Sequence, residues 1–291
     1  MMHSCLLRTL GLAAVVAGGV WSAAHLVAAP RQAPQAAAQT PQRPPVPPDR
    51  RAFDAALQIK DVGQELDAIV KYAEDFPDSE TVYFAVARGM RNVGDADKDD
   101  ATRLRAFVLK IEDAMTKAAM PYRRADVYYN MAYRLANRKV LADDALRLAG
   151  KAVPLLDEQE YIAIQHKLHD DREASLNSRT PSRRPDPFQL AEAVDNFRGV
   201  KANYLSALGR AQLLTGHAAD AEASLLASYT LAPVMETGMA LAGIREKAGK
   251  TAEALAFAMA AALTGKMTAP ERRILETLYA KTHGGSMAAL S

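Results

Sequence analysis

Cysteine, aromatic residues and net charge are all scarce in this sequence. The 291 residues include one cysteine, Cys5, so the chain alone can form neither a disulfide nor a thiolate zinc site, because both need at least two sulfurs. Aromatic residues make up 6%, whereas alanine is abundant, and this balance favours closely packed helices over β-sandwiches. The 36 Lys and Arg nearly cancel the 34 Asp and Glu, so no nucleic-acid partner is indicated. We therefore expect an all-α protein without dithiol redox chemistry.

The motifs of common catalytic and nucleotide-binding sites are also missing. Gly249, Lys250 and Thr251 match the end of a P-loop, but Ile244 stands where the first glycine is needed and the surrounding sequence is helical. Gly249 is expected instead in a turn between two helices. The sequence contains no nucleophile elbow and no dinucleotide fingerprint. We therefore expect a non-enzymatic protein with no catalytic residues, no metal and no cofactor.

One acidic cluster resembles a calcium site in part. Asp95, Asp97 and Asp99 have the spacing that opens an EF-hand loop. However, Asp100 replaces the required glycine and Ala106 replaces the glutamate that closes the calcium shell. An acid-rich helix start is favoured, because carboxylates stabilise the positive end of a helix.

One histidine pair leaves a different function open. His166 and His169 are three residues apart and share a helical face, next to Asp170. Two imidazoles and a carboxylate are a ligand set that transition metals accept. A metal-dependent enzyme is therefore one alternative to a binding protein, and solvated surface residues are the other interpretation of this pair.

Residues 1–29 have the pattern of an export signal. His3 and Arg8 give a weakly basic start, and the apolar run over residues 10–20 ends in small residues. Residues 10–29 also reach the roughly 20 residues needed to cross a membrane, so an uncleaved anchor stays open. We expect an exported protein, periplasmic or secreted, that an uncleaved signal could hold at the inner membrane.

Residues 30–50 have the composition of an exposed, disordered linker. Seven of the 15 prolines of the chain lie there, among glutamine and alanine. Proline fixes φ and removes an amide donor, so we expect neither helix nor sheet. A polyproline ligand for another domain is the functional alternative.

From residue 51 onward, short stretches of helical periodicity alternate with turn signals, and no long strand pattern occurs. Polar residues and prolines crowd residues 170–187, which we expect to be a long exposed loop, either a solvated insertion or a docking loop over a groove. The predicted helices are 51–59, 63–75, 79–92, 99–119, 122–138, 141–156, 158–170, 187–196, 198–215, 218–231, 235–248, 251–264 and 270–283.

Internal repetition is the main signal in these helices. Gly216 and Ala221 recur 33 residues later as Gly249 and Ala254. The first of these units resembles the tetratricopeptide repeat (TPR) family, whose signature is matched at the family's spacings by Leu205, Leu208, Gly209, Gly216, Ala221, Leu225 and Pro233. The next unit and several earlier ones match it less completely. The resemblance implies that residues 51–291 form a right-handed α-solenoid of TPR-like helical hairpins with a terminal capping helix.

Some positions depart from the repeat. Val140 replaces the turn glycine of an earlier unit, and Ser228 replaces the second alanine of the strongest unit. In the following unit, Gly238 and Ala258 replace bulky residues. Small residues at such spacings allow two helices to approach closely, provided that a bulky residue on the other helix fills the gap.

In TPR arrays, four positions of each first helix line a concave face. The resemblance places on that face Asn130, Arg134 and Asn137 of one repeat and Asn203, Ser206 and Arg210 of another. Amide and guanidinium groups suit the backbone and any carboxylate of an extended peptide. A protein or extended peptide is therefore the expected partner, although ordinary solvated helix residues remain the alternative for Arg134 and Arg210.

The end of the repeat region is similar to the helical region that precedes a thioredoxin-like domain in some exported bacterial proteins. The similarity rests on Leu278, Tyr279, Lys281, Thr282, His283 and Gly284. It implies an alternative function, in which the chain is an accessory subunit that docks a separately encoded thioredoxin-like or other envelope enzyme.

Overall fold

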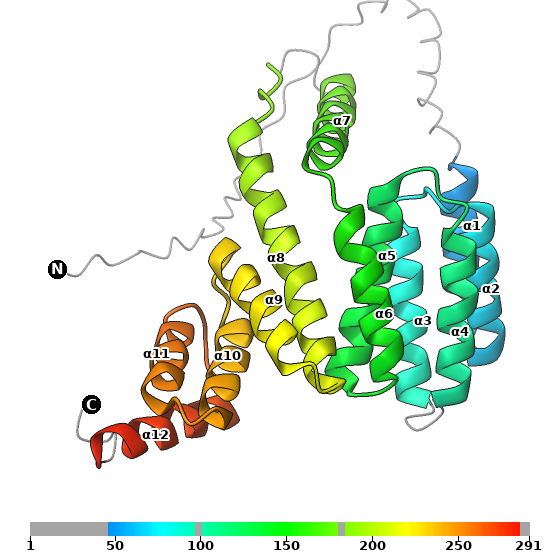
Figure 1. Cartoon of the computed structure of the whole chain (residues 1–291). Helices are drawn as coiled ribbons and strands as arrows, with labels where there is room; N and C mark the ends of the chain where they lie inside the picture. Colours follow the sequence, from blue (N-terminus) through cyan, green and yellow to red (C-terminus); the bar gives the residue numbers. More distant parts are fainter. Residues whose placement is uncertain (1–45, 97–100, 180–183, 286–291) are drawn as a thin grey trace, which may run out of the picture. The chain divides into compact units, whose positions relative to one another are not determined.

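Helices make up most of the chain that the computed structural model describes, residues 46–96, 101–179 and 184–285 (Figure 1). These residues contain no strand, and the all-α prediction is confirmed. The elements are α1 (Pro48–Ala56), α2 (Val62–Asp75), α3 (Val82–Ala96), α4 (Ala101–Met115), α5 (Pro121–Arg138), α6 (Ala142–Ala152), the 3₁₀ helix η1 (Val153–Leu155), α7 (Glu158–Arg179), α8 (Leu190–Leu214), α9 (Ala218–Leu231), α10 (Met235–Lys247), α11 (Thr251–Ala262) and α12 (Ala269–His283).

The predicted signal or anchor, residues 1–29, lies outside the described residues, as does most of the predicted linker. Val46 and Pro47 are irregular, and α1 already begins at Pro48, inside the predicted linker. Proline is favourable in the first turn of a helix, because an amide at that position would have no partner within the helix. No helix of the described ranges is both long and apolar enough to cross a membrane.

The loop predicted at residues 170–187 is wrong in its first half, because α7 continues to Arg179. Polar residues alone do not end a helix, and here an ion pair between Lys167 and Asp171 at i,i+4 supports it. The helices predicted at 187–196 and 198–215 form one helix, α8. Gly199 lies in its interior, where glycine weakens a helix without having to end it.

Within the hairpins α5–α6, α8–α9 and α10–α11, a turn of three residues joins the two helices. Gly216 and Gly249 have φ of 83° and 76° in two of these turns, which confirms their predicted role, since a left-handed residue ends a helix favourably. In the turn that lacks glycine, Lys139 and Leu141 take positive φ values, whereas Val140 does not. The chain thus reverses there without a glycine at that position.

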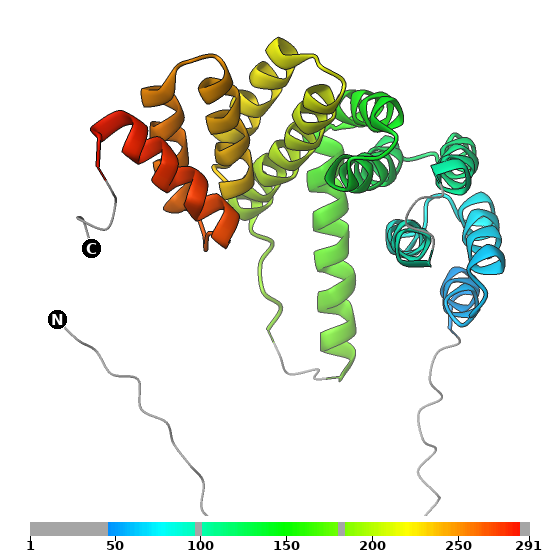
Figure 2. The ribbon, with the colours of Figure 1, turned by 90° about the horizontal axis from the view of Figure 1, so that it is seen from below.

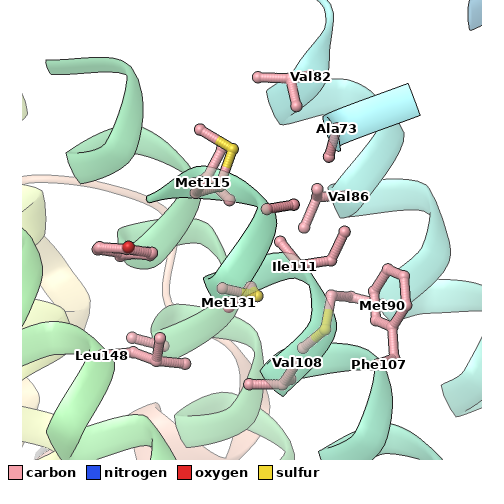
Figure 3. Close-up of a cluster of buried hydrophobic side chains, with 14 of the residues drawn as sticks. Ala73, Val82, Val86, Met90, Phe107, Val108, Ile111, Met115, Met131 and Leu148 are labelled. Carbon is pink, nitrogen blue, oxygen red and sulfur yellow. The ribbon is translucent and has the colours of Figure 1, made fainter. Parts of the chain in front are cut away.

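Neighbouring hairpins contact one another along the chain, as α5 and α6 both pack against α8, and α9 packs against α10. Figure 2 shows the same pairs in a second view. One buried apolar cluster extends through α1 to α6 and reaches α8, and a smaller one lies between α10, α11 and α12. In Figure 3, Met90, Ile111 and Met131 bring α3, α4 and α5 together, and all three are fully buried.

Gly209 marks a close approach between α8 and α9. A Cβ atom at this position would lie 2.6 Å from Leu225 Cγ and 3.1 Å from the backbone oxygen of Ala221. The Leu225 side chain fills the space that a side chain at position 209 would otherwise need. Gly238 has the same role in α10, where a Cβ would lie 2.7 Å from Ala261 Cβ.

Replacing Gly209 by valine should lower the free energy of unfolding by about 1 to 2 kcal/mol, because overpacking outweighs the better helix propensity. The matched control is Gly199→Val in the same helix, where a Cβ meets nothing within 4 Å. There the change should stay within about 0.5 kcal/mol. Urea unfolding followed by circular dichroism measures both, and equal effects would contradict the packing argument.

Candidate functional site

Arg210 of α8 joins α5 and α10 through its guanidinium group. Its Nη1 donates a hydrogen bond to Asn137 Oδ1 of α5 at 2.8 Å, and its Nη2 forms an ion pair with Glu236 Oε2 of α10 at 2.6 Å. Two predicted groove residues, 73 positions apart in the sequence, therefore meet. Arg210 is about one-fifth exposed, whereas the Glu236 side chain is 60% exposed. The guanidinium is thus held in place, while its acidic partner faces solvent.

A cavity of about 500 Å³ opens beside this group. Its polar wall combines positive and negative side chains, so the site is close to electrically neutral. The cavity is lined by Ala136, Asn137, Lys139, Arg210, Leu213, Leu214, Glu236, Met239, Ala240 and Glu271. A ligand with an apolar group next to a polar or charged group fits such a lining. Its apolar group can pack on the apolar side chains, and its polar group can bind the charged ones.

Two of the six predicted groove residues are buried instead of lining a groove. Asn130 is 2% exposed, and its Oδ1 accepts a hydrogen bond from Arg134 Nε at 2.8 Å. The Ser206 hydroxyl is hydrogen-bonded to the Thr237 hydroxyl at 3.1 Å, buried between α8 and α10. Both side chains are instead buried inside the protein, where a polar group needs a partner.

The other two predicted residues differ from each other. Arg134 is half-buried, and burial, followed by the nearby charge of Arg91, lowers its pKa. Asn203 is exposed on α8 and makes no hydrogen bond with the Arg210 group. The structure therefore brings together Asn137 and Arg210, holds Arg134 on Asn130, and leaves Asn203 apart.

Sequence reasoning missed a group of tyrosines that surrounds Asp126 of α5. The Tyr204 hydroxyl of α8 donates a hydrogen bond to Asp126 Oδ1 at 3.3 Å. Tyr129 stacks on Tyr204, with ring centroids 4.3 Å apart and an angle of 8° between the planes. Tyr122 makes an edge contact with Tyr161 of α7 at 5.5 Å. The carboxyl group therefore lies among aromatic side chains of three helices.

A sequence signal for this group was present. Tyr122, Asp126, Tyr129 and Tyr133 are separated by four, three and four residues, which places them along one face of a helix. The positions that line the concave face in TPR arrays pointed instead to Asn130, Arg134 and Asn137 of the same helix. What no spacing could reveal is that Tyr204, 78 residues from Asp126, completes the group.

Burial raises the pKa of the Asp126 carboxyl from 3.8 to about 6, although the charge of Arg123 and the hydrogen bond from Tyr204 act in the opposite direction. The same burial, together with the negative charge of Asp126, raises the pKa of Tyr122 and Tyr204. Their hydroxyls therefore stay protonated at neutral pH and can only donate or accept hydrogen bonds. Keeping the ionised carboxylate in this buried environment lowers the stability of the folded protein. Carboxylates at functional sites often have pKa values raised in this way.

The histidine pair lies on α7, beside a second cavity of about 530 Å³. The Nδ1 atoms of His166 and His169 each lie 3.3 Å from the Asp170 carboxylate, and both rings make edge contacts with Phe188. Within the described ranges, no group of three or more His, Cys, Asp or Glu side chains is arranged to hold a metal ion. The structure thus gives these histidines contacts with the Asp170 carboxylate and with the Phe188 ring.

The structure also shows where the residues of the incomplete P-loop and EF-hand motifs lie. Gly249 occupies the turn between α10 and α11, with no strand before it, so Lys250 and Thr251 have no phosphate loop around them. Of the possible calcium ligands, Asp95 lies in the last turn of α3, and Asp97 and Asp99 lie outside the described residues.

No protein-family model matches this chain, and no curated protein is significantly similar to it.

Proposed function

We propose that the chain is a non-enzymatic scaffold that binds a protein or an extended peptide, and that its hairpins form a right-handed α-solenoid of TPR-like repeats. The three-residue turns and the contacts between successive hairpins support this architecture. In such an array the first helices of the hairpins line one face, and α5, α8 and α10 are first helices here. We place the binding face on these helices.

The Arg210 group carries the proposal. A guanidinium offers a planar fork of donors that suits a carboxylate or a backbone carbonyl. Its acidic partner Glu236 is well exposed, so a ligand oxygen can replace it at low cost, since exposed ion pairs contribute little to stability. Asn137 remains to orient the fork from the other side.

The adjoining apolar wall adds a second kind of contact. Leu213, Leu214, Met239 and Ala240 line the cavity next to the guanidinium. Burying an apolar side chain there contributes roughly 25 cal/mol per Å² of apolar surface, before the costs of ordering the peptide. An extended segment with an apolar residue beside a carboxylate or an exposed backbone carbonyl would use both walls. The location that goes with this proposal is the cell envelope, as the N-terminal pattern predicts.

The test is photo-crosslinking in the cells that produce the protein. A photoreactive amino acid replaces Met239 at the cavity in one variant and the exposed Leu109 of α4 in another. We expect distinct crosslinked proteins from position 239 that are absent from position 109. Adding Arg210→Ala should reduce these products about tenfold or more, because a charge-assisted fork is lost.

The matched control for the arginine is Arg198→Ala in the same helix. Arg198 is 60% exposed and pairs only with the exposed Asp195, so its removal should leave the products unchanged. Products that persist in the Arg210 variant would move the binding face elsewhere. If the captured protein carries a Cys-x-x-Cys pair, the alternative of an accessory subunit for a thioredoxin-like enzyme is favoured over a general scaffold.

A further inference from the structure

Asp126 is a partly buried acidic side chain of α5, one of the helices of the proposed binding face. Among the described residues it forms no ion pair with Lys, Arg or His, and its one hydrogen bond is from Tyr204. The Asp126 side chain is only partly buried. By contrast, the buried carboxylates Glu65 and Glu112 each contact a guanidinium group.

The surroundings of Asp126 favour a positive charge. Phenol rings attract cations to their faces, and a partly desolvated carboxylate attracts them strongly, because water does not compete as well there. The charge of Arg123 and the hydrogen bond from Tyr204 of α8 act on the Asp126 carboxyl, and the charge of Asp126 in turn acts on Tyr122 and Tyr129 of α5, Tyr161 of α7 and Tyr204. Arg123 is the single cation among them, and it does not pair with the carboxylate.

Asp126 also lies on α5, the helix that carries Asn137, which is hydrogen-bonded to Arg210. Tyr129 stacks on Tyr204 beside Asp126, and the charge of Arg210 in turn acts on Tyr129. A segment that runs along α5 and α8 from the Arg210 cavity would therefore pass these tyrosines before it reaches Asp126.

We propose that Asp126 and its tyrosines take the positively charged side chain of a lysine or arginine in the peptide that binds along α5 and α8. The inference deepens the proposed function and rests on it. It sets the direction of the ligand along the two helices, with an oxygen-bearing group at Arg210 and a cationic side chain at Asp126. An alkylammonium or guanidinium group then supplies the ion-pair partner that Asp126 lacks among the described residues.

The test begins with a random dodecapeptide library displayed on phage and selected on the immobilised full-length chain. We expect the selected peptides to share a lysine or arginine. Calorimetry then compares each synthetic peptide with a version in which norleucine replaces that residue. On the wild-type protein the replacement should weaken binding about tenfold or more, and on Asp126→Asn by less than about twofold.

Asp113→Asn, at an exposed position of α4, is the matched control and should behave as the wild type. An equal loss on the wild type and on Asp126→Asn would overturn the inference while the proposed function stands, provided that the peptides still depend on Arg210. A wild-type protein that selects no peptide would overturn both. Binding should also weaken as the pH falls below about 6, where Asp126 takes up a proton.

Discussion

Replacing Arg88 by methionine is expected to lower the free energy of unfolding by about 4 kcal/mol, because it leaves a buried carboxylate without its cation. The Glu65 side chain is only 3% exposed, and its Oε1 accepts a hydrogen bond from Arg88 Nε at 2.5 Å. Arg88 Nη2 also donates to the backbone oxygen of Leu57 at 3.0 Å. Among the described residues, the Asn92 amide would still donate to the carboxylate. Denaturant unfolding measures the loss.

Two comparisons make this prediction specific. Lys110→Met breaks the exposed pair with Asp67, whose side chain is 74% exposed, and should cost less than about 1 kcal/mol. The double variant of Glu65→Gln with Arg88→Met should be more stable than Arg88→Met alone, because the unpaired charge is gone. A double variant as unstable as the single one would show that lost packing, not the buried charge, causes the effect.

Replacing Asp126 by asparagine is expected to stabilise the protein by about 2 to 3 kcal/mol at pH 7.5. Burial raises the pKa of this carboxyl in the folded protein from 3.8 to about 6, so ionisation disfavours folding. Below pH 4 the group is protonated in both states and contributes nothing. Its unfavourable contribution grows between about pH 4 and 6 and is complete above that. Asparagine removes the charge and can still accept the hydrogen bond from Tyr204.

Thermal and urea unfolding at several pH values give the difference between the variant and the wild type. We expect this difference to be near zero at pH 4 and to rise to its full value above pH 6. Asp113→Asn should give a flat difference near zero, because its carboxyl is exposed. A gain for Asp126→Asn that is equally large at pH 4 would mean that packing, not ionisation, explains it. A destabilised variant at every pH would assign Asp126 a structural role in joining α5 and α8.

Helix positions could be predicted to a large extent from local patterns. The 3.6-residue periodicity and the glycine and proline signals predicted most boundaries within a few residues, since these effects act within one turn of a helix. A run of polar residues predicted a loop from residue 170 and the pattern predicted a break at residue 197, whereas α7 continues to Arg179 and α8 runs unbroken from Leu190 to Leu214.

The contacts at the candidate site follow from the tertiary structure. Family spacing predicted that Asn137 and Arg210 share one face, and a hydrogen bond joins the two side chains. It failed for Asn130 and Ser206, because a spacing within one helix does not tell how close the next helix lies. Tyr204 and Asp126 were missed for the same reason, since their contact joins two helices that are far apart in the sequence.

The sequence by itself determined that the described chain is helical, that Gly216 and Gly249 turn it, and that no cysteine pair supplies redox chemistry. Those properties follow from local backbone preferences and from composition. The tertiary structure decided which polar side chains are buried as partners of each other and which remain available to a ligand. The reason is physical: burial and the pKa of Asp126 depend on helices that pack across long stretches of sequence, and such contacts have no local signal.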